Sequence, residues 1–556
     1  MLAQIGFVLA MVAVVVAVGR ISRWSSLPDA VLLTVIGLVY AVLPGPNLLL
    51  SPEVVLDLVI PPLLYHAALG SSLLALRSRL RTVVSLSVVL VMLTAVVTGG
   101  LLAWLVPEVP LAAAVALGAA VAPPDPVAAL AVGRTVGLPA KLSTLIEGEG
   151  LLNDATALTT FQVAVAAAVG GGFSFGDAAG RFALSAVGGL VIGVVVASLV
   201  RLSRRLASDP LSVNAVSLVT PFAAFAAGDA AHVSGVLAVV VAGLIVGHNS
   251  PRLQAGASRL QASAVWDLVN FLLEGFVFLL IGQQLAVVVK GLGAYGTGTI
   301  AVAAAVTVGA VLTVRPVWLV LTQHVPRWLH SRLGGEDDAG AGAGDDAGAG
   351  AGDDVRAGRE RPLSGREIGA MSWAGTRGVI TLSAAFAIPV STAAGHPFPA
   401  RDLLLFLAYL VVLVTLLGQG LTLGPLLRRL GLGANPVDQA RLRNEARTAA
   451  VQAALSRLDQ LAEEDELPGR VVREMRRGLI ARLDRYQRRL EFLEENPATL
   501  RTAGYEAAIR ARRAVIDAQH EELLRWRDAG RLPDTGLRVL QRELDHEERM
   551  LPLPSS

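Results

Sequence analysis

The 556-residue chain contains no cysteine, which excludes disulfides, a thiolate nucleophile and cysteine-ligated metal sites. Charged residues make up only 17% of the sequence, compared with about 25% in ordinary soluble proteins. The formal net charge of +2 gives no indication of a nucleic-acid partner. The eight histidines show no HExxH or similar ligand spacing. What remains is an apolar chain, 53% hydrophobic, without the pattern of a common enzyme site.

The apolar residues are grouped in thirteen stretches, each close to the roughly 20 residues that a membrane-spanning helix needs. This pattern predicts an all-α polytopic membrane protein with about 13 transmembrane helices. The first stretch is followed, not preceded, by Arg20 and Arg23, so we interpret it as a membrane helix rather than a signal peptide. The stretches are centred in residues 2–19, 27–43, 54–70, 82–106, 110–133, 145–170, 182–200, 212–230, 232–248, 265–289, 297–324, 366–391 and 402–427.

Basic residues between the stretches are distributed unevenly. Sixteen fall in one set of alternate loops, whereas the other set holds only Arg181, Lys290 and Arg401. Cytoplasmic loops carry the excess of Lys and Arg. The distribution predicts a multi-pass protein of the cell membrane with its N-terminus outside and its C-terminus in the cytoplasm.

Two segments differ from this apolar background. Residues 334–361 consist largely of Gly, Ala and Asp, cannot bury a core, and are expected to form a disordered cytoplasmic loop. From Asn435 onward, Arg, Glu and Asp dominate and apolar residues recur at helical spacing. We expect a transmembrane domain at 1–430 and a soluble helical cytoplasmic tail at 435–556, whose apolar stripes pack within the tail or on a second subunit.

The fifth stretch is interrupted by Pro123-Pro124-Asp125-Pro126. Prolines remove backbone donors and clash with the preceding turn, so the helix must break here. Broken backbone at membrane depth is tolerated only where it is buried or lines a cavity. Asp125 and the freed carbonyl groups are candidate ligands for a hard cation, and a structural kink capped by Asp125 is the alternative.

The sixth stretch carries several ionisable groups. Glu149 and Asn153 are four residues apart and share a helix face, and Asp154 lies about 100° further round. A buried Asp154 can hold a desolvated cation or a proton, but not both at once, which is the minimal requirement for exchange. A structural aspartate bonded to a neighbouring helix is the alternative.

The twelfth stretch contains Arg377 between two glycines, which suggests a second break. Arg377 keeps its charge and needs a partner within the bilayer. We expect a structural ion pair between Arg377 and Glu149, which leaves Asp154 as the group that titrates. Arg315 lies near a predicted helix end and is interpreted as reaching the interface.

Four further residues are accessory candidates for the ion site. Glu274 stands alone in the tenth stretch, and a carboxylate hydrogen-bonded between helices is an equally good interpretation of it. A lone histidine in a membrane helix is more often a packing residue than a sensor, and this applies to His66. The accessory candidates are Glu147, Glu274, His66 and Thr156.

The broken fifth and twelfth stretches are seven helices apart, as are the third and tenth, which contain His66 and Glu274. This offset suggests that helices 1–6 repeat as helices 8–13. Because the offset is odd, the two copies would be inverted in the membrane. Inverted repeats with broken helices near the midplane are a recurring transporter architecture.

Three motifs resemble those of the monovalent cation:proton antiporters of the Asn-Asp type, which include the bacterial sodium/proton antiporters and the animal sodium/proton exchangers. The motifs are Pro-Pro-Asp-Pro-Val-Ala from Pro123, Gly-Glu-Gly-Leu-Leu-Asn-Asp-Ala-Thr-Ala-Leu from Gly148, and Thr-Arg-Gly-Val-Ile-Thr-Leu from Thr376. The resemblance covers roughly residues 1–430.

The resemblance implies an NhaA-type fold of inverted repeats with crossed broken helices, usually a homodimer in the lipid membrane. It implies that Asp154 binds the ion, that Asn153 is its partner, and that Asp125 lies at the helix crossing. Many relatives have Thr where Pro124 stands, Ser where Gly150 stands, and some have Glu where His66 stands. Because these replacements remove side-chain oxygens that could bind the ion, the sequence does not determine which cation the site selects.

The hypothesis from the sequence is an alternating-access antiporter that exchanges cytoplasmic Na⁺ for external H⁺ at Asp154, one for one and electroneutrally, in pH homeostasis. Na⁺ and H⁺ are its substrates, and no cofactor is expected. A K⁺/H⁺ antiporter of the same fold and a cation channel are the alternatives. An intramembrane enzyme is disfavoured because no nucleophile–base pair, metal spacing or phosphate loop accompanies the acids.

Overall fold

The computed structural model describes residues 2–25, 27–43, 55–170, 175–206, 209–253, 256–332, 363–433, 436–464, 468–495, 503–529 and 531–549. Regular structure in these ranges is helical, apart from one isolated bridge between Ser391 and Pro397. The chain divides into two compact units, Met1–Gly433 and Ala434–Ser556. The predicted loop at 334–361 lies outside the described residues.

The helices of the first unit follow the apolar stretches of the sequence. They are α1 Leu2–Ser25, α2 Asp29–Ala41, α4 Ile60–Gly70, α5 Leu73–Ser78, α6 Leu80–Val84, α7 Leu90–Leu105, α8 Leu111–Val121, α9 Pro126–Val136, α10 Ala140–Val169, α11 Phe175–Leu206, α12 Pro210–Ala230, α13 Gly235–Leu253, α14 Gly256–Gln283, α15 Leu285–Lys290, α16 Thr297–Arg332, α17 Gly365–Trp373, α18 Val379–Phe386, α19 Arg401–Leu413 and α20 Gly420–Leu430. Short π-helical turns at Val55–Val59, Ser85–Val89 and Val414–Gln419 adjoin α4, α7 and α20.

Each of the thirteen predicted stretches coincides with one or more of these helices. Within the described residues, seven helical segments are long and apolar enough to cross a membrane, and three further apolar helices are shorter. The all-helical, polytopic class is therefore confirmed. The number of thirteen crossings stays a prediction.

Apolar side chains on the outside of the unit are consistent with a lipid environment. On α11, Leu184, Val187 and Leu199 have 60–66% of their surface exposed. A soluble protein rarely exposes such apolar surface, because it promotes association. In a bilayer the same surface contacts lipid tails, as the composition predicts.

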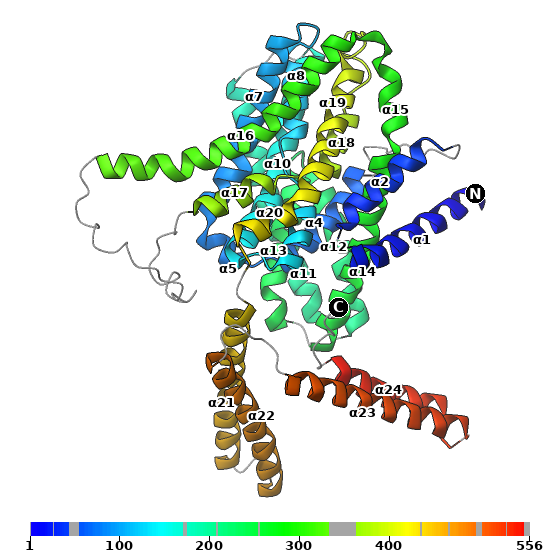
Figure 1. Ribbon diagram of the computed structural model, residues 1–556, viewed down its shortest axis with the longest axis vertical. Helices are drawn as coiled ribbons and strands as arrows, with labels where there is room; N and C mark the ends of the chain where they lie inside the picture. The colour runs from blue at the N-terminus through cyan, green and yellow to red at the C-terminus, as the bar shows by residue number, and fades with distance from the viewer. Residues whose placement is uncertain are drawn as a thin grey trace. The chain divides into compact units, whose positions relative to one another are not determined.

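α10 lies in the middle of the transmembrane unit, where it packs against α4, α7, α8, α9 and α18 (Figure 1). The most extensive packing divides the helices into two groups. The first group consists of α7, α8, α10, α16, α18 and α19, and the second of α1, α2, α4, α11, α12, α13 and α14. α10 contacts α4 and α13, and α18 contacts α14, so the two groups meet beside the broken helices.

The second unit consists of α21 Pro436–Glu463, α22 Gly469–Glu495, α23 Ala503–Asp528 and α24 Asp534–Arg549. α21 packs on α22, and α23 packs on α24. A small core of Val437, Ala440 and Leu493 is buried between the first pair, and Arg441 bonds to Glu494 at 3.1 Å. The helical periodicity of the tail sequence thus corresponds to packed helices.

Two glycines allow α2 and α14 to approach with their backbones almost in contact. A Cβ atom on Gly37 would overlap the carbonyl oxygen of Leu279, and one on Gly282 would overlap the carbonyl oxygen of Thr34. In membranes, lipid tails are as apolar as the helices, so no hydrophobic force drives helix association. Small residues at helix crossings instead allow close packing, which stabilises the contact. This crossing holds α14, which forms one wall of the site described below.

We predict that Gly282→Ala lowers the thermal stability of the purified protein, because the added methyl group must separate α2 from α14. Overpacking of a tight contact costs about 1–3 kcal/mol. Gly100→Ala in α7 is the matched control, since a Cβ there meets nothing within 4 Å. The unfolding midpoint, followed by tryptophan fluorescence in detergent, should fall for Gly282→Ala only. Equal midpoints for the two variants would contradict the close crossing.

Candidate functional site

The proline-rich segment divides one transmembrane stretch into two half-helices. α8 ends at Val121 and α9 begins at Pro126, because the prolines cannot continue the helical hydrogen bonding. Asp125 is the N-cap of α9, and its Oδ1 accepts a 2.9 Å hydrogen bond from the Val127 amide. The predicted break is confirmed, and Asp125 does cap it.

The second break, between α17 and α18, crosses the first. The amide of Asp125 donates to the carbonyl of Thr376 at 2.6 Å, and the Thr376 hydroxyl donates to the carbonyl of Asp125 at 2.9 Å. A Cβ atom on Gly378 would overlap the Asp125 carboxylate, so this approach requires glycine. The N-termini of α9 and α18, the positive ends of their dipoles, therefore meet at the crossing. The predicted crossing of broken helices is confirmed.

Arg377 satisfies backbone carbonyl groups that the breaks leave without helical donors. Its Nε donates to Val121 at 3.0 Å and its Nη2 to Ala122 at 3.2 Å, and its Nη1 donates to Gly375. A guanidinium group has five donors in a fixed fork, which suits this role. Arg377 thus joins the ends of the two half-helices α8 and α17.

The predicted ion pair between Glu149 and Arg377 is wrong. Arg315 of α16 binds Glu149 through both guanidinium nitrogens, with Nη2 at 2.9 Å from Oε2. Its Nε also donates to the Met371 carbonyl at 2.8 Å. The interpretation of Arg315 as an interface residue is wrong too, because only 3% of its surface is exposed.

The pairing differs from the prediction because the carbonyl groups at the helix breaks need hydrogen-bond donors. The guanidinium of Arg377 is occupied by carbonyl groups, so Glu149 takes the second buried arginine. α16 continues to Arg332, which places Arg315 well inside the helix rather than near its end. An arginine within the apolar run of residues 297–324 was the available signal in the sequence.

Asn153 and Asp154 lie on α10 next to the crossing. Asn153 Nδ2 donates to the Pro124 carbonyl at 2.7 Å, while its buried Oδ1 has no hydrogen-bond partner among the described residues. Only 5% of the surface of Asp154 is exposed. The structure shows no hydrogen bond from another described residue to its carboxylate, which faces a cavity.

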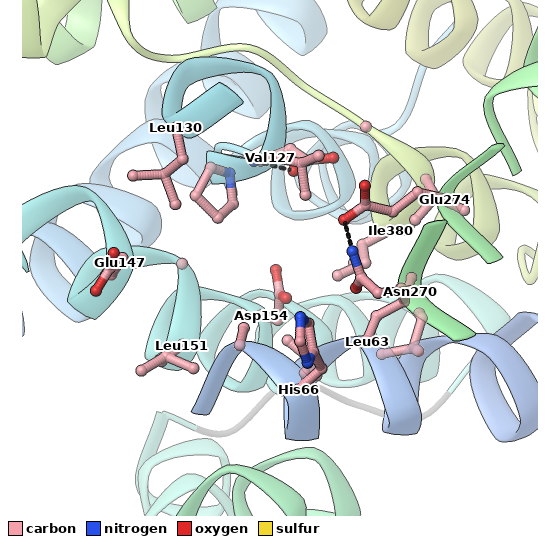
Figure 2. A pocket seen from close by; sticks show the side chains of 18 of the residues that line it. Leu63, His66, Val127, Leu130, Glu147, Leu151, Asp154, Asn270, Glu274 and Ile380 are labelled. Atoms are coloured by element: carbon pink, nitrogen blue, oxygen red, sulfur yellow. Dashed lines mark hydrogen bonds between the residues drawn. The ribbon is translucent and has the colours of Figure 1, made fainter. Parts of the chain in front are cut away.

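The cavity has a volume of about 450 Å³ and is bounded by both broken helices, α4, α10 and α14. Figure 2 shows Asp154 pointing into it from α10 and Glu274 from α14, and His66 of α4 also lines it. Asp125 also contributes to the lining, so its capping role and a role in the cavity are compatible.

The structure places three of the four accessory candidates on this cavity. Glu147, Glu274 and His66 line it. Thr156 does not line it but is buried, and its hydroxyl donates to the Leu152 carbonyl at 3.4 Å. Thr381 of α18 does line it, although it was not among the candidates.

Gly150 supplies no side-chain oxygen, and Pro126 occupies the position that a larger side chain at residue 150 would take. A Cβ atom at Gly150 would overlap the Pro126 ring. α9 therefore packs directly on α10 beside Asp154. The carbonyl of Pro124 accepts a hydrogen bond from Asn153 on the same side of the site.

A double-mutant cycle tests whether Arg315 or Arg377 is the partner of Glu149. Directly paired groups show interaction energies of about 0.5–3 kcal/mol. We predict that Glu149→Gln and Arg315→Gln are strongly coupled in unfolding stability, because each leaves the other charge buried and unpaired. The cycle of Glu149→Gln with Arg377→Gln should give a smaller coupling. A larger coupling to Arg377 would refute the observed pairing.

Comparison with known proteins shows relatives over most of the chain. Residues 8–429 match the family described as sodium/hydrogen exchanger, transmembrane. The chain is 33% identical to an uncharacterized Na⁺/H⁺ exchanger of Mycobacterium tuberculosis, over 90% of this chain and 88% of that protein. It is 28% identical to the sodium, potassium, lithium and rubidium/H⁺ antiporter of Bacillus subtilis, over 95% and 75%. It is 32% identical to the Na⁺/H⁺ antiporter NhaP of Pseudomonas aeruginosa, over 70% and 83%.

The fold is also similar to a solved structure, the sodium proton antiporter of Methanocaldococcus jannaschii at pH 8. The TM-score is 0.56 at 19% identity, and the match covers 77% of this chain and 99% of that chain. At this identity the similarity establishes the fold, and the family match establishes the relationship. The chain belongs to the sodium/hydrogen exchanger transmembrane family.

Proposed function

We propose that the protein exchanges Na⁺ for H⁺ by alternating access, with Asp154 as the group that holds either ion. The observation that carries this proposal is the buried Asp154 carboxylate, which faces a cavity without a hydrogen bond from another described residue. Burying a charged carboxylate without a hydrogen-bond or ionic partner costs free energy. A proton or a bound cation neutralises it, and the two cannot occupy it together.

The surrounding charges support a one-for-one exchange. The charges of Glu149 and Arg315 compensate each other in a buried ion pair. Asn153 carries no charge, and Asp125 lies against the N-termini of α9 and α18. Asp154 then has the same net charge in its Na⁺-loaded and H⁺-loaded states, so the exchange is electroneutral.

The lining of the cavity supports access from the cytoplasm in this conformation. The lining includes Gly70 and Ser71, which precede the basic residues Arg77, Arg79 and Arg81. Excess positive charge marks the cytoplasmic side of membrane proteins. We therefore place the C-terminus and the tail in the cytoplasm, the N-terminus outside, and the protein in the cell membrane. The homodimer is proposed from the resemblance to the antiporter family alone.

K⁺/H⁺ exchange is the second candidate. The relative from Bacillus subtilis is named for sodium, potassium, lithium and rubidium, and Gly150 itself provides no side-chain oxygen that would select one of these cations. Proton flux in proteoliposomes, driven in turn by Na⁺, K⁺ and Li⁺, separates the candidates. A response to K⁺ alone would contradict Na⁺ exchange.

Asp154→Asn should abolish cation-dependent proton flux, because the amide can neither release a proton nor neutralise a cation. The measurement is pH change in proteoliposomes after a Na⁺ pulse, at matched protein content. Asp209→Asn is the control, since Asp209 is an exposed N-cap and asparagine caps equally well. Flux retained by a folded Asp154→Asn protein would refute the assignment.

The exchange rate should not change when a membrane potential of either sign is imposed with a thiocyanate gradient. Asn153→Asp adds a second carboxylate beside Asp154 and should make the rate sensitive to the potential. The comparison uses the same proteoliposomes and the same Na⁺ gradient. A steady-state rate of the unmodified protein that follows the potential would contradict electroneutral exchange.

A further inference from the structure

The cavity has a second acidic wall that faces Asp154. On α10, Glu147 and Asp154 are seven residues apart, and on α14 the same spacing separates Asp267 from Glu274. Seven residues make two helical turns, about 10 Å, and return to the same helix face. All four carboxylates line the cavity. Each wall therefore carries an outer and an inner carboxylate.

The two walls belong to different helix groups. α10 packs with α7 and α8, whereas α14 packs with α1 and α2. In Figure 2, Asp154 and Glu274 enter the cavity from these separate helices. A cation that reaches Asp154 consequently passes a carboxylate on the opposite group of helices.

The exposure of the carboxylates decreases from the mouth inward. The Asp267 side chain is 73% exposed and lies 3.9 Å from His66 Nε2, whereas Glu274 is only partly exposed and Asp154 is 5% exposed. Charges in water are screened strongly, and charges in a cleft with low-dielectric walls are not. The inner carboxylates therefore dominate the attraction on an entering cation.

Asn270 fixes the orientation of Glu274. Its Nδ2 donates to Glu274 Oε1 at 2.7 Å, and the two residues are one turn apart on α14. The bond orients the carboxylate within its own helix, and both residues line the cavity. Carboxylate and amide oxygens are the ligands that hard cations take in proteins.

We propose that Glu274, positioned by Asn270, captures the entering cation on the α14 wall and sets the apparent cation affinity of the antiporter. This inference rests on the proposed exchange at Asp154 and assigns a separate residue to it. Asp154 carries the ion through the cycle. Glu274 raises the local cation concentration and stays on its wall, so it adds no charge to the exchange.

The test is the apparent KM for Na⁺ in proteoliposomes. Glu274→Gln should raise it roughly tenfold, at the low end of the about 10- to 1,000-fold range by which a cleft lined with charge of one sign concentrates counter-ions. The maximal rate and the insensitivity to membrane potential should be retained. Asn270→Ala should shift KM in the same direction by less, and Glu274→Asp should restore most of the affinity.

Two further variants separate local capture from general surface charge. Asp402→Asn removes an exposed carboxylate at the start of α19, away from the cavity lining, and should leave KM unchanged. Asp267→Asn removes the exposed carboxylate of the same wall and should have a smaller effect than Glu274→Gln. An equal or larger effect of Asp267→Asn would overturn the specific role of Glu274.

The remaining outcomes are also decisive. An unchanged KM in Glu274→Gln, or a lost maximal rate at unchanged KM, would overturn the capture role. If Glu274→Gln does not fold, Asn270→Ala and Glu274→Asp carry the test, and wild-type KM in Asn270→Ala would overturn it. Absence of cation-dependent proton flux in the unmodified protein would instead refute the proposed exchange.

Discussion

The structure depends on satisfying the backbone of two broken helices inside an apolar environment. Each break frees carbonyl and amide groups that water cannot reach, and each unsatisfied group would cost several kcal/mol. The breaks bond to each other through Asp125 and Thr376. Arg377 and Asn153 bond to the carbonyl groups that remain beside them. The crossing is therefore stable only as a unit.

This requirement determines how the buried charges are arranged. Because Arg377 serves the carbonyl groups, the carboxylate of Glu149 depends on Arg315. Two buried charges are tolerated when they pair and find further hydrogen bonds, and Arg315 also bonds to the Met371 carbonyl. The pairing leaves Asp154 as the carboxylate of α10 that faces the cavity beside the crossing. The carboxylate of the structural ion pair and the carboxylate proposed to exchange ions are thus separated within one helix.

The division into two helix groups gives the cavity two different walls. One wall contains the crossing and Asp154, and the other contains the Glu274–Asn270 pair. The close approach of α2 and α14 through Gly37 and Gly282 keeps the second wall in place. Relative movement of the groups would change which side of the membrane reaches Asp154, while each wall keeps its own hydrogen bonds.

Much of the fold followed from local features of the chain. Apolar runs predicted the helices, and Pro123, Pro124 and Pro126 predicted the first break, because a ring without an N–H donor acts at its own position. The motif around Asp154 predicted a carboxylate at a cavity. Partners of the charges could not be predicted in the same way. Arg315 was misplaced because the true end of α16 lies beyond the apolar run.

The sequence by itself determined where helices form, where two of them break, and which carboxylate is costly to bury. These properties depend on residue type and spacing along the chain. The tertiary structure alone decided that Glu149 pairs with Arg315, which is 166 positions away, and that Glu274 shares a cavity with Asp154. Such contacts depend on the depth and rotation of helices far apart in sequence, and helical periodicity leaves both undetermined.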